Sequence, residues 1–92
     1  MTDYKQNKRI EFSPIFDKQI ATASIKIKFA FREAYDLFAE NPTHPSLRNH
    51  LLMGKYAGFR SIDVTEDWRA VYREEPERFL FMELGTHSQL YG

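Results

Sequence analysis

The first apolar positions of the chain predict a short strand followed by a helix. Residues 9–12 (Arg-Ile-Glu-Phe) alternate polar and apolar side chains, as a strand does when one of its faces is buried. Ser13 and Pro14 then provide a helix N-cap and a proline suited to the first helical position. Three apolar residues recur on one side of this helix, and we expect them to be buried: Phe16, Ile20 and Ala23.

A second helical pattern starts near Ile27 and ends at Asn41-Pro42, where proline stops the helix. Residues 25–29 (Ile-Lys-Ile-Lys-Phe) also alternate as a strand would, but the longer helical period that follows favours a helix. We expect this helix to pack antiparallel to the first. Its apolar positions recur every three or four residues: Ile27, Ala30, Phe31, Ala34, Leu37 and Phe38.

Three strand-like runs follow a proline-containing loop, at residues 59–64, 68–73 and 79–84. The polar segments between them, residues 65–67 and 74–77, are typical of tight turns. The runs therefore predict an antiparallel three-strand meander, which the N-terminal strand joins and whose one face the two helices cover. We expect an α+β fold and a single domain over residues 1–92.

Alternation within the strands predicts which side chains share a face. Ile62 and Val64 belong to the core side, and Asp63 points the other way, together with Phe59 and Ser61. The last run has two rows, and hydrophobicity alone does not decide which is buried. One row is Leu80, Met82 and Leu84, and the other is Phe79, Phe81 and Glu83.

Composition narrows the class of protein. The 92 residues contain no cysteine, which argues against a small disulfide-stapled secreted protein. No apolar run approaches the roughly 20 residues of a membrane helix, and the N-terminus lacks a signal peptide, so we expect a cytoplasmic protein without membrane contact. The 13 basic and 13 acidic residues cancel, so a nucleic-acid role must rest on local clustering of positive charge.

The second half of the chain contains several short motifs whose order and spacing can be compared with those of known families. They are Gly58-Phe59-Arg60-Ser61, then residues 67–73 (Asp-Trp-Arg-Ala-Val-Tyr-Arg), then Gly85-Thr86-His87 with Leu90-Tyr91, and a histidine at His50. Residues 48–92 thus resemble the YafQ branch of the RelE-like toxins of bacterial type II toxin–antitoxin systems. Residues 1–47 share only the architecture of that family, a strand and two helices before the sheet.

The resemblance implies a ribosome-dependent endoribonuclease that cuts mRNA and is held inactive by a cognate antitoxin protein. It implies attack by the neighbouring 2′-hydroxyl, with no metal or cofactor. Such a reaction needs proton transfer and stabilisation of a charged phosphorane. By resemblance, three residues match acid–base positions: His50, Asp67 and His87. Three others match substrate-binding positions: the phosphate-facing Arg60 and the aromatic Trp68 and Tyr91.

Two departures from the family weaken the nuclease prediction. Asp63 stands where the YafQ branch has histidine, and Glu83 stands where it has arginine. A carboxylate near the scissile phosphate repels it, and the loss of an arginine forfeits charge stabilisation. We therefore expect slow cleavage unless one carboxylate acts as a base or a lysine or arginine from elsewhere substitutes.

Other interpretations of these residues stay open. Trp68 beside a turn suits a structural anchor slightly better than a base-stacking platform. Gly85 could supply an unusual backbone angle and Thr86 a cap where the strand ends. A divalent metal held by His50, Asp63, Asp67, Glu83 and His87 is a minor hypothesis.

A non-enzymatic protein is the main alternative: a toxin fold that has lost cleavage, or one that acts on a protein target as ParE-like toxins do. Whatever the chemistry, we expect an antitoxin either to add a strand at the sheet edge or to dock an amphipathic helix on the two helices. Apolar residues that fall off the main buried stripe are the candidates for that surface: Ile25, Phe29 and Tyr35.

Overall fold

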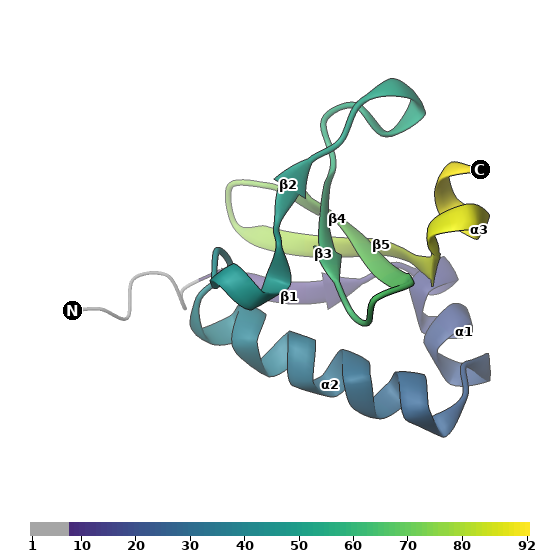
Figure 1. The fold of residues 1–92 in the computed structure, drawn as a ribbon. Helices are drawn as coiled ribbons and strands as arrows, with labels where there is room; N and C mark the ends of the chain where they lie inside the picture. Colours follow the sequence, from purple (N-terminus) through teal and green to yellow (C-terminus); the bar gives the residue numbers. More distant parts are fainter. Residues whose placement is uncertain (1–7) are drawn as a thin grey trace.

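The computed structural model describes residues 8–92, and Figure 1 shows its elements in order. The helices are α1 (Pro14–Thr22), α2 (Ile25–Glu40) and α3 (His87–Tyr91), and the strands are β1 (Arg9–Phe12), β2 (His50–Leu51), β3 (Arg60–Asp63), β4 (Trp68–Glu74) and β5 (Arg78–Thr86). Two 3₁₀ turns, η2 (Pro45–Leu47) and η3 (Gly54–Tyr56), flank β2. None of the helices within residues 8–92 has the length and apolar character needed to cross a membrane.

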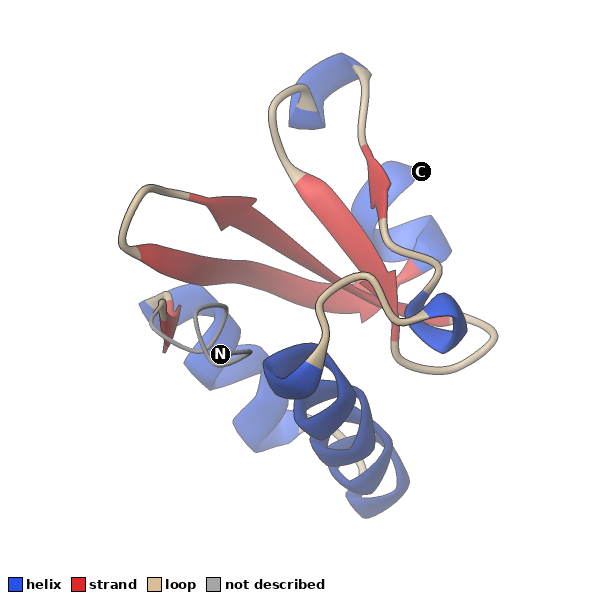
Figure 2. Ribbon diagram, turned by 90° about the vertical axis from the view of Figure 1, so that its left-hand side faces the viewer, coloured by secondary structure: helices blue, strands red, loops and turns tan. Residues whose placement is uncertain are grey.

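The five strands form one sheet in the order β1-β5-β4-β3-β2. β1 runs parallel to β5, and the other neighbours are antiparallel. Helices α1 and α2 lie on one face of this sheet, while α3 lies on the other (Figures 1 and 2). The predicted α+β fold, with its N-terminal strand, two helices and meander, is confirmed, while β2 and α3 are additions that the sequence patterns did not predict.

Side-chain caps fix where the two long helices begin. The Ser13 hydroxyl accepts a hydrogen bond from the Phe16 amide, and Ser24 accepts one from the Ile27 amide. Because Ser24 caps α2, the ambiguous residues 25–29 are helical. The helices diverge from the turn between them rather than lying along one another (Figure 1), and they meet where the Phe16 and Phe31 rings lie 5.1 Å apart.

The core between the helices and the sheet is largely aromatic. Phe38 packs edge-to-face on Tyr72, Phe79 and Phe81, with ring centroids 4.9–5.2 Å apart. Phe16 and Ile62 are also fully buried in this cluster, as alternation and helical period predicted. Full burial of each such ring contributes about 1.5–3 kcal/mol of hydrophobic stabilisation.

A β-bulge at Met82 corrects the expected arrangement of β5. Val71 pairs with Glu83 and Tyr72 pairs with Phe81, so Met82 is the extra residue. Strict alternation fails at this point. As a result Leu84 joins Phe79 and Phe81 in the core, and Glu83 turns to the opposite face.

Helix α3 approaches β5 closely at Gly85. A Cβ at this position would lie 3.1 Å from Gln89 Oε1 and 3.4 Å from side-chain atoms of Leu90. The expected unusual backbone angle is wrong, because the glycines with positive φ in the described chain are Gly54 and Gly58. Gly85 instead makes room for α3, whose start Thr86 caps in a capping box with Gln89.

Candidate functional site

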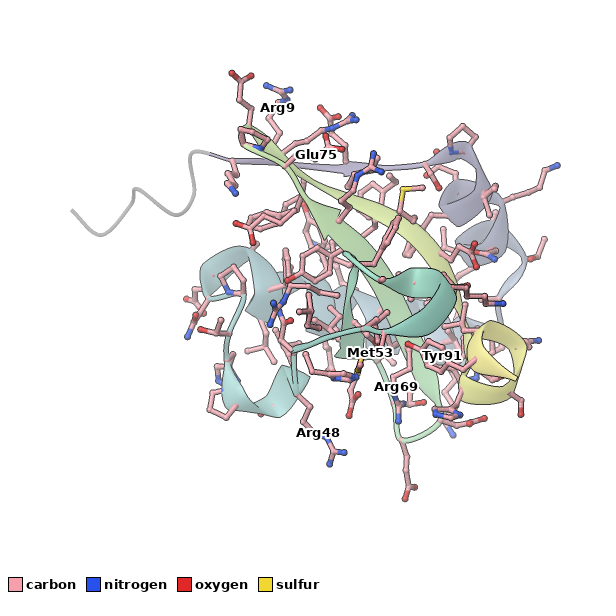
Figure 3. The ribbon with its side chains drawn as sticks, turned by 90° about the horizontal axis from the view of Figure 1, so that it is seen from above. Arg9, Arg48, Met53, Arg69, Glu75 and Tyr91 are labelled. Carbon is pink, nitrogen blue, oxygen red and sulfur yellow. The ribbon has the colours of Figure 1, made fainter. Side chains whose placement is uncertain are left out.

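The sheet face opposite α1 and α2, called the open face below, carries two cross-strand rows of residues. The first row runs from β2 to β5 and consists of His50, Ser61, Val71 and Glu83. The second consists of Asp63, Arg69 and Gly85. Directly paired residues of antiparallel strands point to the same side, so each row is a set of neighbours. Figure 3 looks onto this face and labels Arg48, Arg69 and Tyr91.

His50 is exposed, and a backbone contact determines which of its ring nitrogens carries the hydrogen. The ring Nδ1 lies 2.9 Å from the carbonyl oxygen of Arg48. A carbonyl oxygen can only accept, so Nδ1 carries the hydrogen and Nε2 of the neutral ring keeps its lone pair. Arg48 has a left-handed backbone (φ 47°), which is unusual for a non-glycine residue. The neutral His50 ring therefore presents a basic nitrogen that is not used in this contact.

Tyr91 connects α3 to the first row. Its hydroxyl donates to Ser61 Oγ at 3.2 Å, and its ring lies 4.9 Å from the His87 ring. The His87 amide in turn donates to the carbonyl oxygen of Asp67 at 2.9 Å. Since His50 pairs directly with Ser61, a chain of contacts through Ser61 and Tyr91 links His50 to His87, and it reaches Asp67 only through the backbone. The Asp67 carboxylate itself is exposed at the β3–β4 turn.

Arg60 is not part of this group, because it points to the helix side of the sheet. It pairs with the buried Tyr72, and its Nε donates to Asn49 Oδ1 at 2.8 Å. It lines a cavity of about 540 Å³ whose walls include Lys8 and Phe79. The phosphate-facing role implied for Arg60 therefore has no geometric support on the open face.

Trp68 lies on the helix side of the sheet, away from His50, although it lines one hollow together with Asp67. Its half-buried ring packs against the core, and it lines surface hollows beside Thr22 and Ala23 of the α1–α2 turn. The anchoring role considered for it in the sequence is the one that this packing supports.

Two arginines neutralise Asp63. Its Oδ1 lies 3.1 Å from Arg69 Nε, and its Oδ2 lies 3.2 Å from Arg48 Nε. Two guanidinium groups around one carboxylate leave a net positive charge. The repulsion expected from Asp63 is thus offset by arginines from elsewhere in the chain, which is the alternative that the sequence had left open.

Glu83 is held by a hydrogen bond from Tyr56, whose hydroxyl lies 2.9 Å from Glu83 Oε1. Burial and this contact with Glu83 raise the pKa of Tyr56 to about 12. Tyr56 therefore stays a neutral donor across the physiological range. Its ring also packs edge-to-face on Tyr91, with centroids 5.8 Å apart.

The minor metal hypothesis loses its basis. Nowhere within residues 8–92 do three or more histidine, cysteine or acidic side chains lie close enough to hold a metal ion. Asp63 and Glu83 are instead engaged by the guanidinium groups and the phenol described above.

Sequence reasoning did not identify Arg48, Arg69 or Tyr56 as members of this face. Arg48 carried one usable signal, because it lies two residues before His50. The pairing of Arg69 with Asp63 follows only from the strand register. Tyr56 is brought to Glu83 by the η3 turn, which has no periodic pattern.

The apolar surface expected on the helices is present in part. Ile25 and Phe29, one turn apart on α2, are 69% and 68% exposed. Tyr35 is half-buried instead, with its ring 6.1 Å from that of Phe12.

Comparison with known proteins identifies relatives of this chain. Residues 8–92 match the family model described as the bacterial toxin of type II toxin–antitoxin system, YafQ. The chain is 29% identical over 87 residues to the mRNA interferase toxin YafQ of Escherichia coli strain K12, an overlap of 90% of this chain and 95% of that protein.

Solved structures agree with the family model. The crystal structure of YafQ from E. coli BL21(DE3) superposes with a TM-score of 0.78 at 25% identity, covering 92% of this chain and 99% of that one. The E. coli DinJ–YafQ complex gives a TM-score of 0.64 at 25% identity, with the same coverage of 92% and 99%. The predicted family is therefore confirmed, and the chain belongs to the YafQ family of toxins from bacterial type II toxin–antitoxin systems.

Proposed function

We propose that the protein is the toxin of a type II pair and an mRNA endoribonuclease that works on the ribosome, in the cytoplasm. The name of its E. coli relative, an mRNA interferase toxin, supports this activity. The observation that carries the proposal is the His50–Arg48 contact, which leaves His50 Nε2 available as a base. Tyr91 and His87 complete the group on the same face.

The reaction needs only the RNA and groups of the protein. In our proposal His50 Nε2 removes the proton of a ribose 2′-hydroxyl, whose oxygen attacks the adjacent phosphorus. The bond from phosphorus to the 5′ oxygen of the next nucleotide then breaks, and the protonated His87 ring donates the proton that this oxygen needs. The products are a 2′,3′-cyclic phosphate and a 5′-hydroxyl. General acid–base catalysis of this kind contributes about 10²–10⁴-fold in rate.

The remaining predicted residues take supporting roles. Tyr91 packs against His87 and is fixed by Ser61, so it can position the His87 ring. Asp67 holds the first turn of α3 through its backbone carbonyl. Arg60 and Trp68 contribute to the fold in this proposal rather than to RNA contacts.

A cognate antitoxin is the proposed partner of the helix side. The DinJ–YafQ complex is an assembly of a relative. Ile25 and Phe29 form an exposed apolar pair with helical spacing, which suits the apolar side of an amphipathic helix.

Induced expression with primer extension on a reporter transcript tests the nuclease. We expect growth arrest and new 5′ ends, and the loss of both in His87→Ala. His44→Ala is the matched control, because His44 lies outside the open-face rows. Growth arrest without new 5′ ends would favour a toxin fold that acts on a protein target.

A further inference from the structure

Arg48 has an unusual combination of backbone and side-chain properties. Its left-handed backbone, with φ and ψ both 47°, directs the carbonyl to His50. Its side chain is 75% exposed, and within residues 8–92 Asp63 is its one ion-pair partner. That pair uses the Nε edge of the guanidinium. The two terminal nitrogens are therefore available for another anion.

Asp63 cannot by itself neutralise Arg48, because it already pairs with a more firmly held arginine. Arg69 is only 15% exposed, and its Nη1 donates to the carbonyl oxygens of Thr65 and Glu66 at 3.0 and 2.9 Å. These bonds fix Arg69 against the β3–β4 turn. One oxygen of Asp63 serves Arg69 and the other serves Arg48, so the surplus positive charge lies at the solvent-exposed arginine.

We propose that Arg48 binds a backbone phosphate of the mRNA beside His50, with Asp63 as the residue that positions it. This inference rests on the proposed nuclease function. A guanidinium binds phosphate through two parallel N–H donors, a geometry that lysine cannot reproduce. Because the same residue supplies the carbonyl that fixes the His50 ring, the phosphate and the base are held in register. Arg48 thereby provides a cation on a face where Glu83 replaces an arginine.

The chain contains a matched control for Arg48. Arg32 on α2 is 74% exposed, and its Nε lies 3.2 Å from a carboxylate oxygen of Asp36, the same pairing distance as for Arg48 and Asp63. It lies on the helix side of the molecule. Arg32→Ala therefore removes an equally exposed, equally paired charge without touching the open face.

The first experiment measures binding to ribosomes, either empty or programmed with a 2′-O-methyl mRNA that cannot undergo 2′-hydroxyl attack. We expect Arg48→Ala to weaken binding to programmed ribosomes about 10-fold, the range for a charged hydrogen bond, and to lower the slope of log affinity against log salt by about 0.7. Arg32→Ala should change neither quantity. Equal effects of the two variants, or an equal loss on empty ribosomes, would overturn the inference.

A second experiment separates positioning from simple repulsion by Asp63. If Asp63 only repelled RNA, Asp63→Asn would bind programmed ribosomes more tightly. We expect weaker binding instead, with partial recovery in Asp63→Glu, which can keep both ion pairs. Tighter binding by Asp63→Asn would refute the positioning role.

Failure of the inference can be told apart from failure of the nuclease proposal by the primer-extension assay. Cleavage by the unchanged protein that is equally efficient in Arg48→Ala would reject only the role of Arg48. Absence of cleavage in the unchanged protein, with the ribosome-binding differences intact, would reject the nuclease while keeping the phosphate site.

Discussion

The Nδ1 nitrogen of His50 lies 2.9 Å from the carbonyl oxygen of Arg48, and this one contact determines the tautomer of the neutral ring. His44 has the opposite arrangement, because its Nδ1 accepts a hydrogen bond from the Ser46 amide at 3.1 Å. The two histidines therefore carry their ring hydrogen on different nitrogens.

The tautomers can be observed directly. In long-range ¹H–¹⁵N spectra at about pH 9, where histidines are ordinarily neutral, we expect His50 to be the Nδ1–H form and His44 the Nε2–H form. His44 serves as the internal reference for the spectral pattern. An Nε2–H pattern for His50 would remove the basic nitrogen from the position that the mechanism needs.

Tyr56 should make stability depend on alkaline pH. Its pKa in the folded protein is about 12, above the ordinary value of about 10, so the neutral phenol favours the folded state. This contribution is complete below about pH 10 and is lost as the pH rises to about 12. In denaturant titrations, Tyr56→Phe should weaken the dependence of the free energy of unfolding on pH between about 10 and 12. In a pH titration of tyrosinate absorbance, the part that disappears in Tyr56→Phe should be the part that develops at the higher pH. An unchanged slope in Tyr56→Phe would contradict the assignment.

Asn49 should be a large single contributor to stability on the helix side. Its Nδ2 donates to Tyr72 Oη at 2.8 Å and to the Pro42 carbonyl at 2.9 Å, while its Oδ1 accepts from Arg60. We expect Asn49→Ala to cost about 1–3 kcal/mol in the free energy of unfolding, because the buried Tyr72 hydroxyl loses one of its two side-chain partners and Arg60 Nε loses its acceptor. In Asn49→Ala/Tyr72→Phe the combined cost should be smaller than the sum of the single costs. Strict additivity would show that the two groups do not interact.

Gly85→Ala tests the close packing of α3 on β5. The added Cβ would meet Gln89 Oε1 at 3.1 Å, and Gln89 is needed for the capping box. Overpacking of this kind typically costs about 1–3 kcal/mol. We expect that loss in thermal or denaturant unfolding, together with faster amide exchange in α3. Ser88→Ala, at an exposed position of the same helix, is the control and should stay within about 0.5 kcal/mol of the unchanged protein.

Phe29→Ser tests the antitoxin surface. Phe29 is exposed in the isolated toxin, so its loss should leave stability unchanged. Burying a phenylalanine against a partner contributes about 1.5–3 kcal/mol, and we expect at least a 10-fold weaker antitoxin affinity by calorimetry. Met53→Ser is the control, since Met53 is also a large apolar residue and is even more exposed (84% against 68% for Phe29), but it precedes η3 on the other side of the sheet. If Phe29→Ser and the unchanged protein bound the antitoxin with equal affinity, Phe29 would not be part of the antitoxin-binding surface.

Local patterns predicted the fold well because its strands and long helices are periodic and capped. The burial of Phe38 follows from such a pattern, whereas α2 begins at Ile25, two residues before the expected Ile27, because of the Ser24 cap. Helix α3 was missed because it has only five residues, although the Thr86-x-x-Gln89 spacing is a usable signal. The bulge at Met82 left no mark in the hydrophobic pattern, so the face of Glu83 could not be predicted.

The site was harder to predict than the fold, since it depends on contacts between distant segments. His50, His87 and Tyr91 came from the family resemblance, and their proximity required the register of β2 with β3 and the docking of α3. Arg60 does not join these residues, because it lies on the same face of β3 as Ile62, which packs against the helices.

The parallel pairing of β1 with β5 has a consequence for the order of folding. The Ser13 hydroxyl, at the start of α1, donates to the Met82 carbonyl 69 residues away, and among the strands of residues 8–92 β1 pairs with β5 alone. Contacts so distant in the chain form slowly, whereas hairpins form from neighbours. We therefore expect β3, β4 and β5 to assemble first, with the N-terminal strand added at the end, so that the stacking of Phe12 on Phe81 is among the last aromatic contacts to form.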